Sequence, residues 1–85
     1  MDYPIDYTQY TKEEIIELVS FLHSIEQYAL DPKSVSQTEL IKHHKTFCTI
    51  LNNRSEEKRI DKLFKNQTGF SIYDIITKIK EQYNQ

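Results

Sequence analysis

Thr11-Lys12-Glu13-Glu14 decides the fold class, because a hydroxyl residue followed three positions later by a carboxylate is the capping box that starts an α-helix. Tyr10 before it and Ile15 after it can pack together as a hydrophobic staple. Similar starts recur at Ser36-Gln37-Thr38-Glu39, Asn53-Arg54-Ser55-Glu56 and Ser71-Ile72-Tyr73-Asp74. Four helix starts in 85 residues predict four helices.

Helix stops fall between these starts. Asp31-Pro32 disfavours a helical residue before the proline ring, Asn52-Asn53 interrupts the second helix, and Gly69 stands where a left-handed cap is expected. The sequence therefore predicts an all-α fold, a compact bundle of four short helices over residues 12–29, 37–51, 54–67 and 72–83. The short loops favour nearly antiparallel neighbours. We expect one helical domain over residues 1–85, with residues 1–10 as an extended aromatic arm that packs on the bundle.

The apolar faces differ in width. The first predicted helix gathers apolar side chains over about half of its circumference, which is wider than one packing seam. The third has a narrow stripe of Ile60, Leu63 and Phe64. We therefore expect the first helix to be central and the third peripheral.

Composition excludes several classes of protein. No apolar run approaches the roughly 20 residues of a membrane span, so no membrane is expected as a partner. The acidic N-terminus lacks the basic and apolar parts of a secretory signal. Cys48 is the one cysteine, which excludes an internal disulfide and fits a reducing compartment. These observations predict a cytoplasmic protein.

The net charge of -2 conceals an asymmetry. Residues 1–31 carry a net charge of -6, whereas residues 32–65 carry +4. The two segments can attract each other within one domain, or the basic one can offer a surface to an anionic partner.

The order of motifs resembles Uncharacterised Protein Family 0223, a set of short proteins from low-GC Gram-positive bacteria. The resemblance rests on the following ordered elements: Tyr3-Pro4-Ile5-Asp6, Thr11-x-Glu13-Glu14-Ile15, Phe21 with Ile25-Glu26 and Tyr28, Phe47, Glu56-Glu57-Lys58, and Gly69-Phe70-Ser71-x-Tyr73. It runs from about Tyr3 to Ile79. It implies a small all-helical cytoplasmic protein with no established activity and no catalytic residues. The chain departs from the family pattern at Tyr10, His44, Cys48 and Asn52, where the family favours Trp, Tyr, Lys and Pro.

Glu26 falls inside the apolar arc of the first helix, and a buried carboxylate must be paired, hydrogen-bonded or protonated. His44 falls inside the arc of the second helix, so Glu26 and His44 form a candidate buried polar pair. The alternative is an acid near a helix end and a histidine packed as an aromatic ring. His44 also stands one turn before Cys48, a spacing that can activate a thiolate, but a small core residue explains Cys48 better. The histidines do not share a face at metal-binding spacing, so we expect no metal site and no cofactor.

Two surfaces are candidates for contact with a partner. Arg54, Lys58, Lys62 and Lys65 line one side of the third helix and form a candidate anion-binding face. A solvated helix face is the alternative. Tyr3, Tyr7 and Tyr10 make the N-terminal arm a candidate partner surface, because tyrosine is enriched in binding hot spots. The arm can instead fold over the bundle and extend its core.

No glycine-rich phosphate loop, nucleophile elbow or converging carboxylate pair is present, so we expect no enzyme activity. The function itself is unknown from the sequence. We expect a protein-interaction or adaptor module that binds an unidentified protein, a second copy of itself included. The alternative is a weak RNA- or DNA-binding accessory protein that uses the basic face of the third helix.

Overall fold

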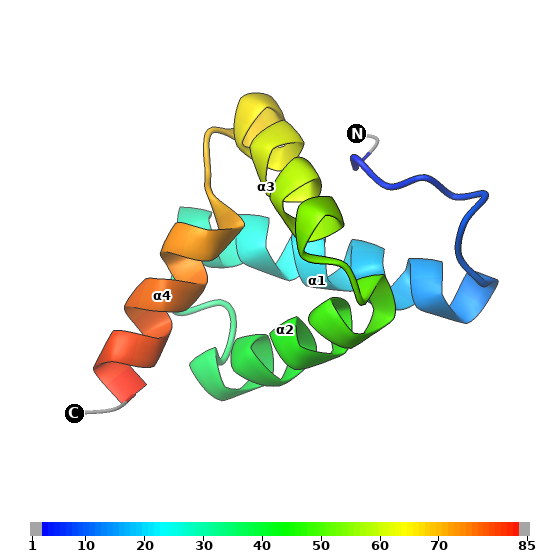
Figure 1. Cartoon of the computed structure of the whole chain (residues 1–85). Coiled ribbons are helices and arrows are strands. Elements are labelled where there is room, and N and C mark those ends of the chain that lie inside the picture. Colours follow the sequence, from blue (N-terminus) through cyan, green and yellow to red (C-terminus); the bar gives the residue numbers. More distant parts are fainter. Residues whose placement is uncertain (1–2, 84–85) are drawn as a thin grey trace.

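Four α-helices account for most of residues 3–83, the part of the chain that the computed structural model describes (Figure 1). Along the chain they are α1 (Lys12–Leu30), α2 (Gln37–Leu51), α3 (Arg54–Thr68) and α4 (Ile72–Tyr83). The predicted all-α bundle is confirmed, and the predicted helix bounds agree with the observed ones to within one residue.

The helix starts are capped by the side chains that the sequence indicated. At α1 the Glu14 amide donates to the Thr11 hydroxyl (3.1 Å), and the Thr11 amide donates to the Glu14 carboxylate (2.9 Å). At α2 the Ser36 hydroxyl accepts from the Glu39 amide at 3.5 Å, but the Glu39 carboxylate lies 3.6 Å from His43 instead of returning to Ser36. The capping box expected there is therefore half formed.

The helix ends use left-handed residues and a proline. Asn52 ends α2 at φ 47°, and Gly69 ends α3 at φ 85°. Asp31 ends α1 in an extended conformation before Pro32, as the steric restriction on residues before proline requires. The chain therefore turns sharply after each of the first three helices.

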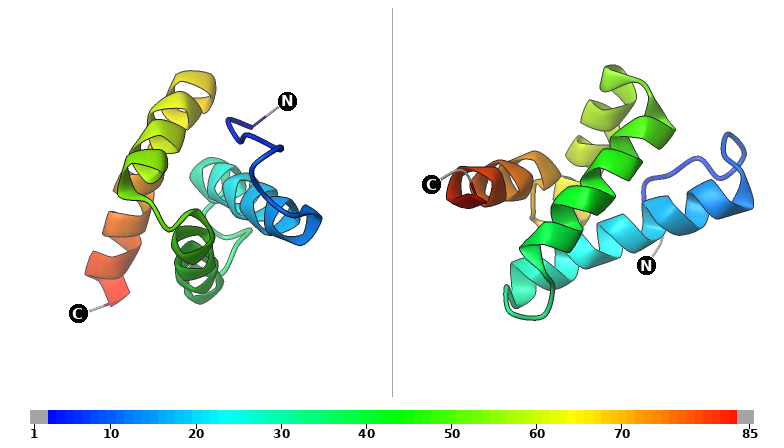
Figure 2. Two further views of the ribbon diagram at one scale, coloured as in Figure 1. Left: turned by 45° about the vertical axis from the view of Figure 1, so that its right-hand side comes forward. Right: turned by 90° about the horizontal axis from the view of Figure 1, so that it is seen from below.

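Two pairs of helices make up the bundle. α1 and α2 run in opposite directions side by side, and α3 and α4 cross on one side of this pair (Figure 2). α2 packs closely against all three other helices, whereas α1 packs mainly against α2, so α2 shares the central position that was expected of the first helix alone. The reason is that α3 and α4 both fold back over α2. The nearly antiparallel arrangement expected of all neighbours applies to α1 and α2, whereas α3 and α4 are steeply inclined to them.

The core joins all four helices and the arm. α1 supplies the largest share, and α3 the smallest with Ile60 and Phe64. Leu63, expected in the stripe of α3, is 37% exposed because it lies at the edge of that stripe. The buried apolar side chains are Ile5, Leu18, Phe21, Leu22, Ile25, Leu40, Phe47, Leu51, Ile60, Phe64, Ile72, Ile76 and Ile79.

Candidate functional site

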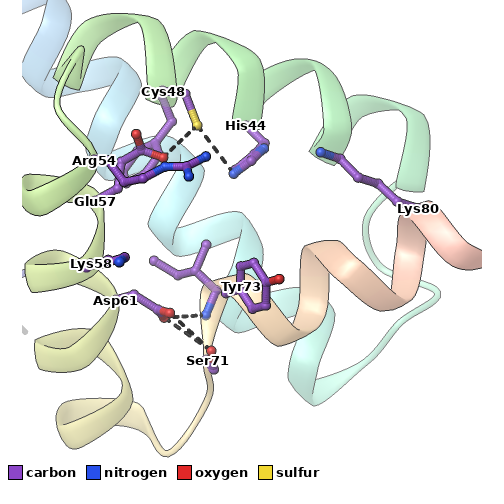
Figure 3. A pocket seen from close by; sticks show the side chains of 11 residues that line it. His44, Cys48, Arg54, Glu57, Lys58, Asp61, Ser71, Tyr73 and Lys80 are labelled. Atoms are coloured by element: carbon purple, nitrogen blue, oxygen red, sulfur yellow. Dashed lines mark hydrogen bonds between the residues drawn. The ribbon is translucent and has the colours of Figure 1, made fainter.

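An open groove of about 640 Å³ lies between α2, α3 and α4 (Figure 3). α2 contributes three lining residues, α3 four and α4 three, and Ser71 lies directly before α4. Phe47 and Ile72 supply buried apolar surface, and most of the other lining side chains carry a charge, a thiol, an imidazole or a hydroxyl. The lining residues are His44, Phe47, Cys48, Arg54, Glu57, Lys58, Asp61, Ser71, Ile72, Tyr73 and Lys80.

A joint between α3 and α4 gives the groove its shape. Asp61, at the middle of α3, accepts a hydrogen bond from the Ile72 amide (2.7 Å) and from the Ser71 hydroxyl (3.2 Å). Asp61 thereby caps the first turn of α4, where unpaired amides and the helix dipole favour a negative charge. α4 consequently begins beside the middle of α3, and the first half of α3 and α4 form two walls of the groove (Figure 3).

Cys48 lies in the part of the groove where α2 meets α3. Its thiol donates a hydrogen bond to the Glu57 carboxylate (3.2 Å) and lies 3.5 Å from Nε2 of His44. Burial raises the pKa of the Cys48 thiol to about 11, and the hydrogen bond and charge of Glu57 add to the effect. The neutral thiol is therefore the stable form, and it occupies the Glu57 carboxylate.

His44 packs as an aromatic ring in the wall of the groove. Its centroid lies 5.7 Å from that of Phe21 and 6.4 Å from that of Phe47. Burial, and secondly the positive charge of Lys80, lower the pKa of His44 below its ordinary value. The imidazole is therefore neutral at neutral pH and leaves the charge of the groove to other residues.

Three cations face the groove from opposite walls. Arg54 and Lys58 extend from α3 and Lys80 from α4, and their charged ends point toward the space between them (Figure 3). Within residues 3–83, the two ion pairs found are Glu56 with Arg59 and Glu39 with His43, so none of the three has an ionic partner there. Tyr73 adds an aromatic ring that is 71% exposed.

The pairing of Glu26 with His44 is not found. Oε2 of Glu26 is buried and has no hydrogen-bond partner among the described residues, and the charge of Glu26 acts on Tyr3 in the arm. His44 instead faces the groove beside Cys48. The prediction is wrong because the two residues, although both lie on apolar arcs, face different neighbours: Glu26 lies near the arm, and His44 lies toward α3 and α4.

The aromatic arm packs on the bundle with two of its three candidate tyrosines. The Tyr3 ring stacks on Phe64 at 6.2 Å, and its hydroxyl lies 3.3 Å from Nδ1 of His23. Tyr10 is half-buried against the core, whereas Tyr7 is 47% exposed. Burial raises the pKa of Tyr3, as does, to a lesser degree, the charge of Glu26. The arm therefore extends the core and leaves one tyrosine on its surface.

The candidate anion-binding face is exposed along the whole of α3. The structure divides it in two, because Arg54 and Lys58 line the groove and Lys62 and Lys65 do not. Lys80, which α4 brings opposite Arg54 and Lys58, was not part of the predicted face. Lys80 is far from α3 in the sequence, so the sequence does not indicate that the two lie close together.

The sequence comparison identifies the family. The model of an uncharacterised protein family (UPF0223) matches residues 1–85. The chain belongs to UPF0223. It is 38% identical over 79 residues to a UPF0223 protein of Bacillus cytotoxicus, covering 93% of this chain and 85% of that one. A UPF0223 protein of Staphylococcus epidermidis is 32% identical over 83 residues, covering 98% of this chain and 87% of its own length. One of Streptococcus uberis is 32% identical over 80 residues, covering 94% and 84%.

UPF0223 membership confirms the resemblance seen in the sequence and assigns no activity. No solved structure gives a significant match to this UPF0223 protein. In the described part of the chain, no helix is long and apolar enough to span a membrane. Residues 3–83 also hold no group of three His, Cys, Asp or Glu side chains arranged to bind a metal ion.

The groove of this UPF0223 protein, and three residues that define it, could not be predicted from the sequence. Asp61 lies among the basic residues of α3 without a motif of its own, Tyr73 belongs to the predicted helix start at residues 71–74, and Lys80 lies outside every predicted site. Asp61 and Ile72 are separated by 11 positions, and their contact depends on the path of the loop between α3 and α4. The one available signal was the glycine at the end of α3, which indicated a turn at that place.

Proposed function

We propose that this UPF0223 protein is a small binding module without catalytic activity, which holds a segment of a partner protein in the groove between α2, α3 and α4. The observation that carries the proposal is an apolar floor with a charged rim. Phe47 and Ile72, 3% and 4% exposed, line the bottom, and the exposed ring of Tyr73 extends this apolar surface. At its edge stand cations that have no ionic partner within residues 3–83. Protein-binding surfaces have this anatomy, with a poorly hydrated centre and a polar periphery.

Tyr73 gives the groove a candidate hot spot. Its ring is 71% exposed in a protein whose other groove-lining aromatic residue, Phe47, is 3% exposed. Tyrosine combines a large apolar area with a polar tip and loses little entropy on ordering, which makes it frequent in hot spots. A partner segment that covers Tyr73 would remove this ring from water.

The chemistry of the groove supports binding over catalysis. A nucleophilic cysteine needs a lowered pKa, whereas the pKa of Cys48 is raised to about 11. Asp61 is engaged by the start of α4 and Glu57 by the thiol, so neither carboxylate is free to act as a general base. We propose the cytoplasm as the compartment, since Cys48 is a free thiol.

Site-specific photo-crosslinking in living cells tests the module. A photoreactive phenylalanine analogue replaces Tyr73 at the groove, or Ile16 on the exposed face of α1 as the matched control, since Ile16 is 54% exposed and outside the groove. The proposal expects a defined protein adduct from position 73 and none of that size from position 16. Equal adduct patterns from the two positions would rule out the groove as the binding surface.

A second pair of variants separates the groove from the basic face of α3. Lys80→Glu changes the groove alone, and Lys65→Glu changes the basic face alone. Both lysines stand in the last turn of their helices, so the cost of reversing a charge at a helix end is matched. Loss of the adduct in Lys80→Glu alone supports the module. A nuclease-sensitive adduct that Lys65→Glu reduces would favour the RNA- or DNA-binding alternative. Adducts that contain only two copies of this protein would show that it self-associates through the groove and does not bind another protein there.

A further inference from the structure

The groove contains more positive charges than the protein itself neutralises. Three cations and two carboxylates line it, for a net formal charge of +1 in a protein whose total is -2. The two carboxylates already have donors within the protein: Asp61 holds the Ile72 amide at 2.7 Å, and Glu57 holds the Cys48 thiol at 3.2 Å. Arg54, Lys58 and Lys80 have no ionic partner in the described chain.

We infer that the occupant of the groove is an acidic segment of a partner protein, with an apolar or aromatic residue flanked by Asp or Glu. This inference rests on the proposed function and names the class of ligand for that same site. The apolar residue covers Phe47 and Ile72 and packs against Tyr73. The flanking carboxylates lie between the two walls, where Arg54 and Lys58 face Lys80 (Figure 3).

Charge complementarity selects this occupant over a basic or neutral one. A basic segment would place like charges opposite all three cations, and like charges across an interface are disfavoured. A neutral apolar segment would cover the floor but leave the three cations without partners. An acidic segment satisfies both parts of the groove, and Arg54 can bind a carboxylate through two parallel hydrogen bonds.

A nucleic-acid backbone satisfies only one part. Phosphates could pair with the cations, but Glu57 and Asp61 lie in the same lining and repel a dense row of negative charges. The apolar residues at the bottom of the groove also favour an apolar group as a ligand, and a phosphate backbone has none to place there. The acidic residues of this protein's own first turn of α1, Glu13 and Glu14, are held in a folded helix, whereas a flexible acidic segment of a partner can adapt to the groove.

Selection from a random dodecamer peptide library displayed on phage tests the inference. Binders are selected on the wild-type protein and depleted on Tyr73→Ala, so that the retained peptides depend on the groove. We expect the retained peptides to be enriched in Asp and Glu beside an aromatic or large aliphatic residue. Retained peptides that are neutral or basic would overturn the acidic preference while leaving the binding module intact. If no retained peptide depends on Tyr73, the groove itself fails as a binding site.

A retained peptide then allows the contributions of the cations to be measured by fluorescence anisotropy. Lys80→Glu and Lys58→Glu should each weaken binding by about tenfold, because each loses an attraction and gains a repulsion of similar size. Lys65→Glu, the matched control outside the groove, should change the affinity by less than about twofold. Raising the salt from about 0.1 M to 1 M should weaken wild-type binding, since the screening length falls from about 10 Å to 3 Å. Equal losses in Lys65→Glu and Lys80→Glu would contradict the assignment to the groove.

Discussion

Asp61→Ala should be among the most damaging substitutions of a surface-accessible charge in this protein, because Asp61 is the joint between α3 and α4. Its carboxylate accepts the Ile72 amide at 2.7 Å and the Ser71 hydroxyl at 3.2 Å. No neighbouring side chain in the described contacts replaces it at the Ile72 amide. The alanine variant therefore leaves the Ile72 amide without its acceptor, although the Ser71 hydroxyl still caps the Asp74 amide at 3.3 Å.

The magnitude follows from the contacts. Both hydrogen bonds end on the Asp61 carboxylate, and a hydrogen bond to a charged group contributes about 1.5 to 3 kcal/mol. Asp61 is half-buried, and the Ser71 hydroxyl can rotate to bond water once the carboxylate is gone. The expected loss therefore comes mainly from the Ile72 amide and is about 2 kcal/mol. For a domain of this size a loss of about 1 kcal/mol lowers Tm by roughly 4 to 8 °C, so Tm should fall by about 10 °C.

Two controls isolate the joint. Asp74→Ala removes another carboxylate from the first turn of α4, one that accepts no hydrogen bond from residues 3–83, and should cost about 0.5 kcal/mol through the helix dipole alone. Asp61→Asn keeps an oxygen that can accept from the Ile72 amide and loses only the charge, so its cost should be intermediate. Urea denaturation followed by far-ultraviolet circular dichroism gives all three values. If Asp61→Ala costs no more than Asp74→Ala, the joint between α3 and α4 does not stabilise the fold as argued.

Three further outcomes follow from single features of the structure. Removing residues 1–9 should lower the free energy of unfolding by about 2 kcal/mol or more in a urea titration, because the deletion exposes core side chains that Ile5, 7% exposed, now covers. Unchanged stability would show that the arm does not contribute to the core and is available for a partner. Gly69→Ala should cost about 1 kcal/mol in the same assay, since φ is 85° there and no neighbouring atom would clash with the added carbon; a neutral result would show that the turn relaxes. Cys48 has its pKa raised to about 11, so alkylation by iodoacetamide should be slow at pH 8 and rise about tenfold per pH unit up to about pH 10. Glu57→Gln removes the charge that raises this pKa and replaces one carboxylate oxygen by an N–H donor that can stabilise the thiolate. It should therefore speed alkylation at pH 8, whereas an unchanged rate would mean that burial alone protects the thiol.

The helices could be predicted because residues close together in the sequence determine where each helix begins and ends. Thr11 and Glu14 are three residues apart, and both of their hydrogen bonds form within one turn. Gly69 likewise acts at its own position, through a backbone angle that other residues adopt at a cost. Such signals depend only on residues that are neighbours in the chain, so a single sequence is enough to detect them.

The groove could not be predicted because it depends on the inclination of α3 and α4. An apolar arc says that a face is buried, but not which neighbour covers it. Glu26 and His44 both lie on such arcs, and the structure turns Glu26 toward Tyr3 and His44 toward Cys48. The position of Lys80 opposite Arg54 is likewise decided by the contact of Asp61 with Ile72 across the loop. These are contacts between distant segments, and helical periodicity carries no information about them.

Asp61 links the stability of the fold to the charge of the groove, and the link separates two explanations of a binding defect. Asp61→Asn lowers stability, but it also raises the net charge of the groove lining from +1 to +2. If acidic segments bind there, the asparagine variant should bind an acidic groove-dependent peptide at least as well as the wild type at a temperature where both are folded. Asp61→Ala, which releases the start of α4 and so moves one wall, should bind it more weakly. Both substitutions destabilise the fold, but they should act in opposite directions on peptide binding. If the groove were only a gap between packed helices, there would be no reason for this difference.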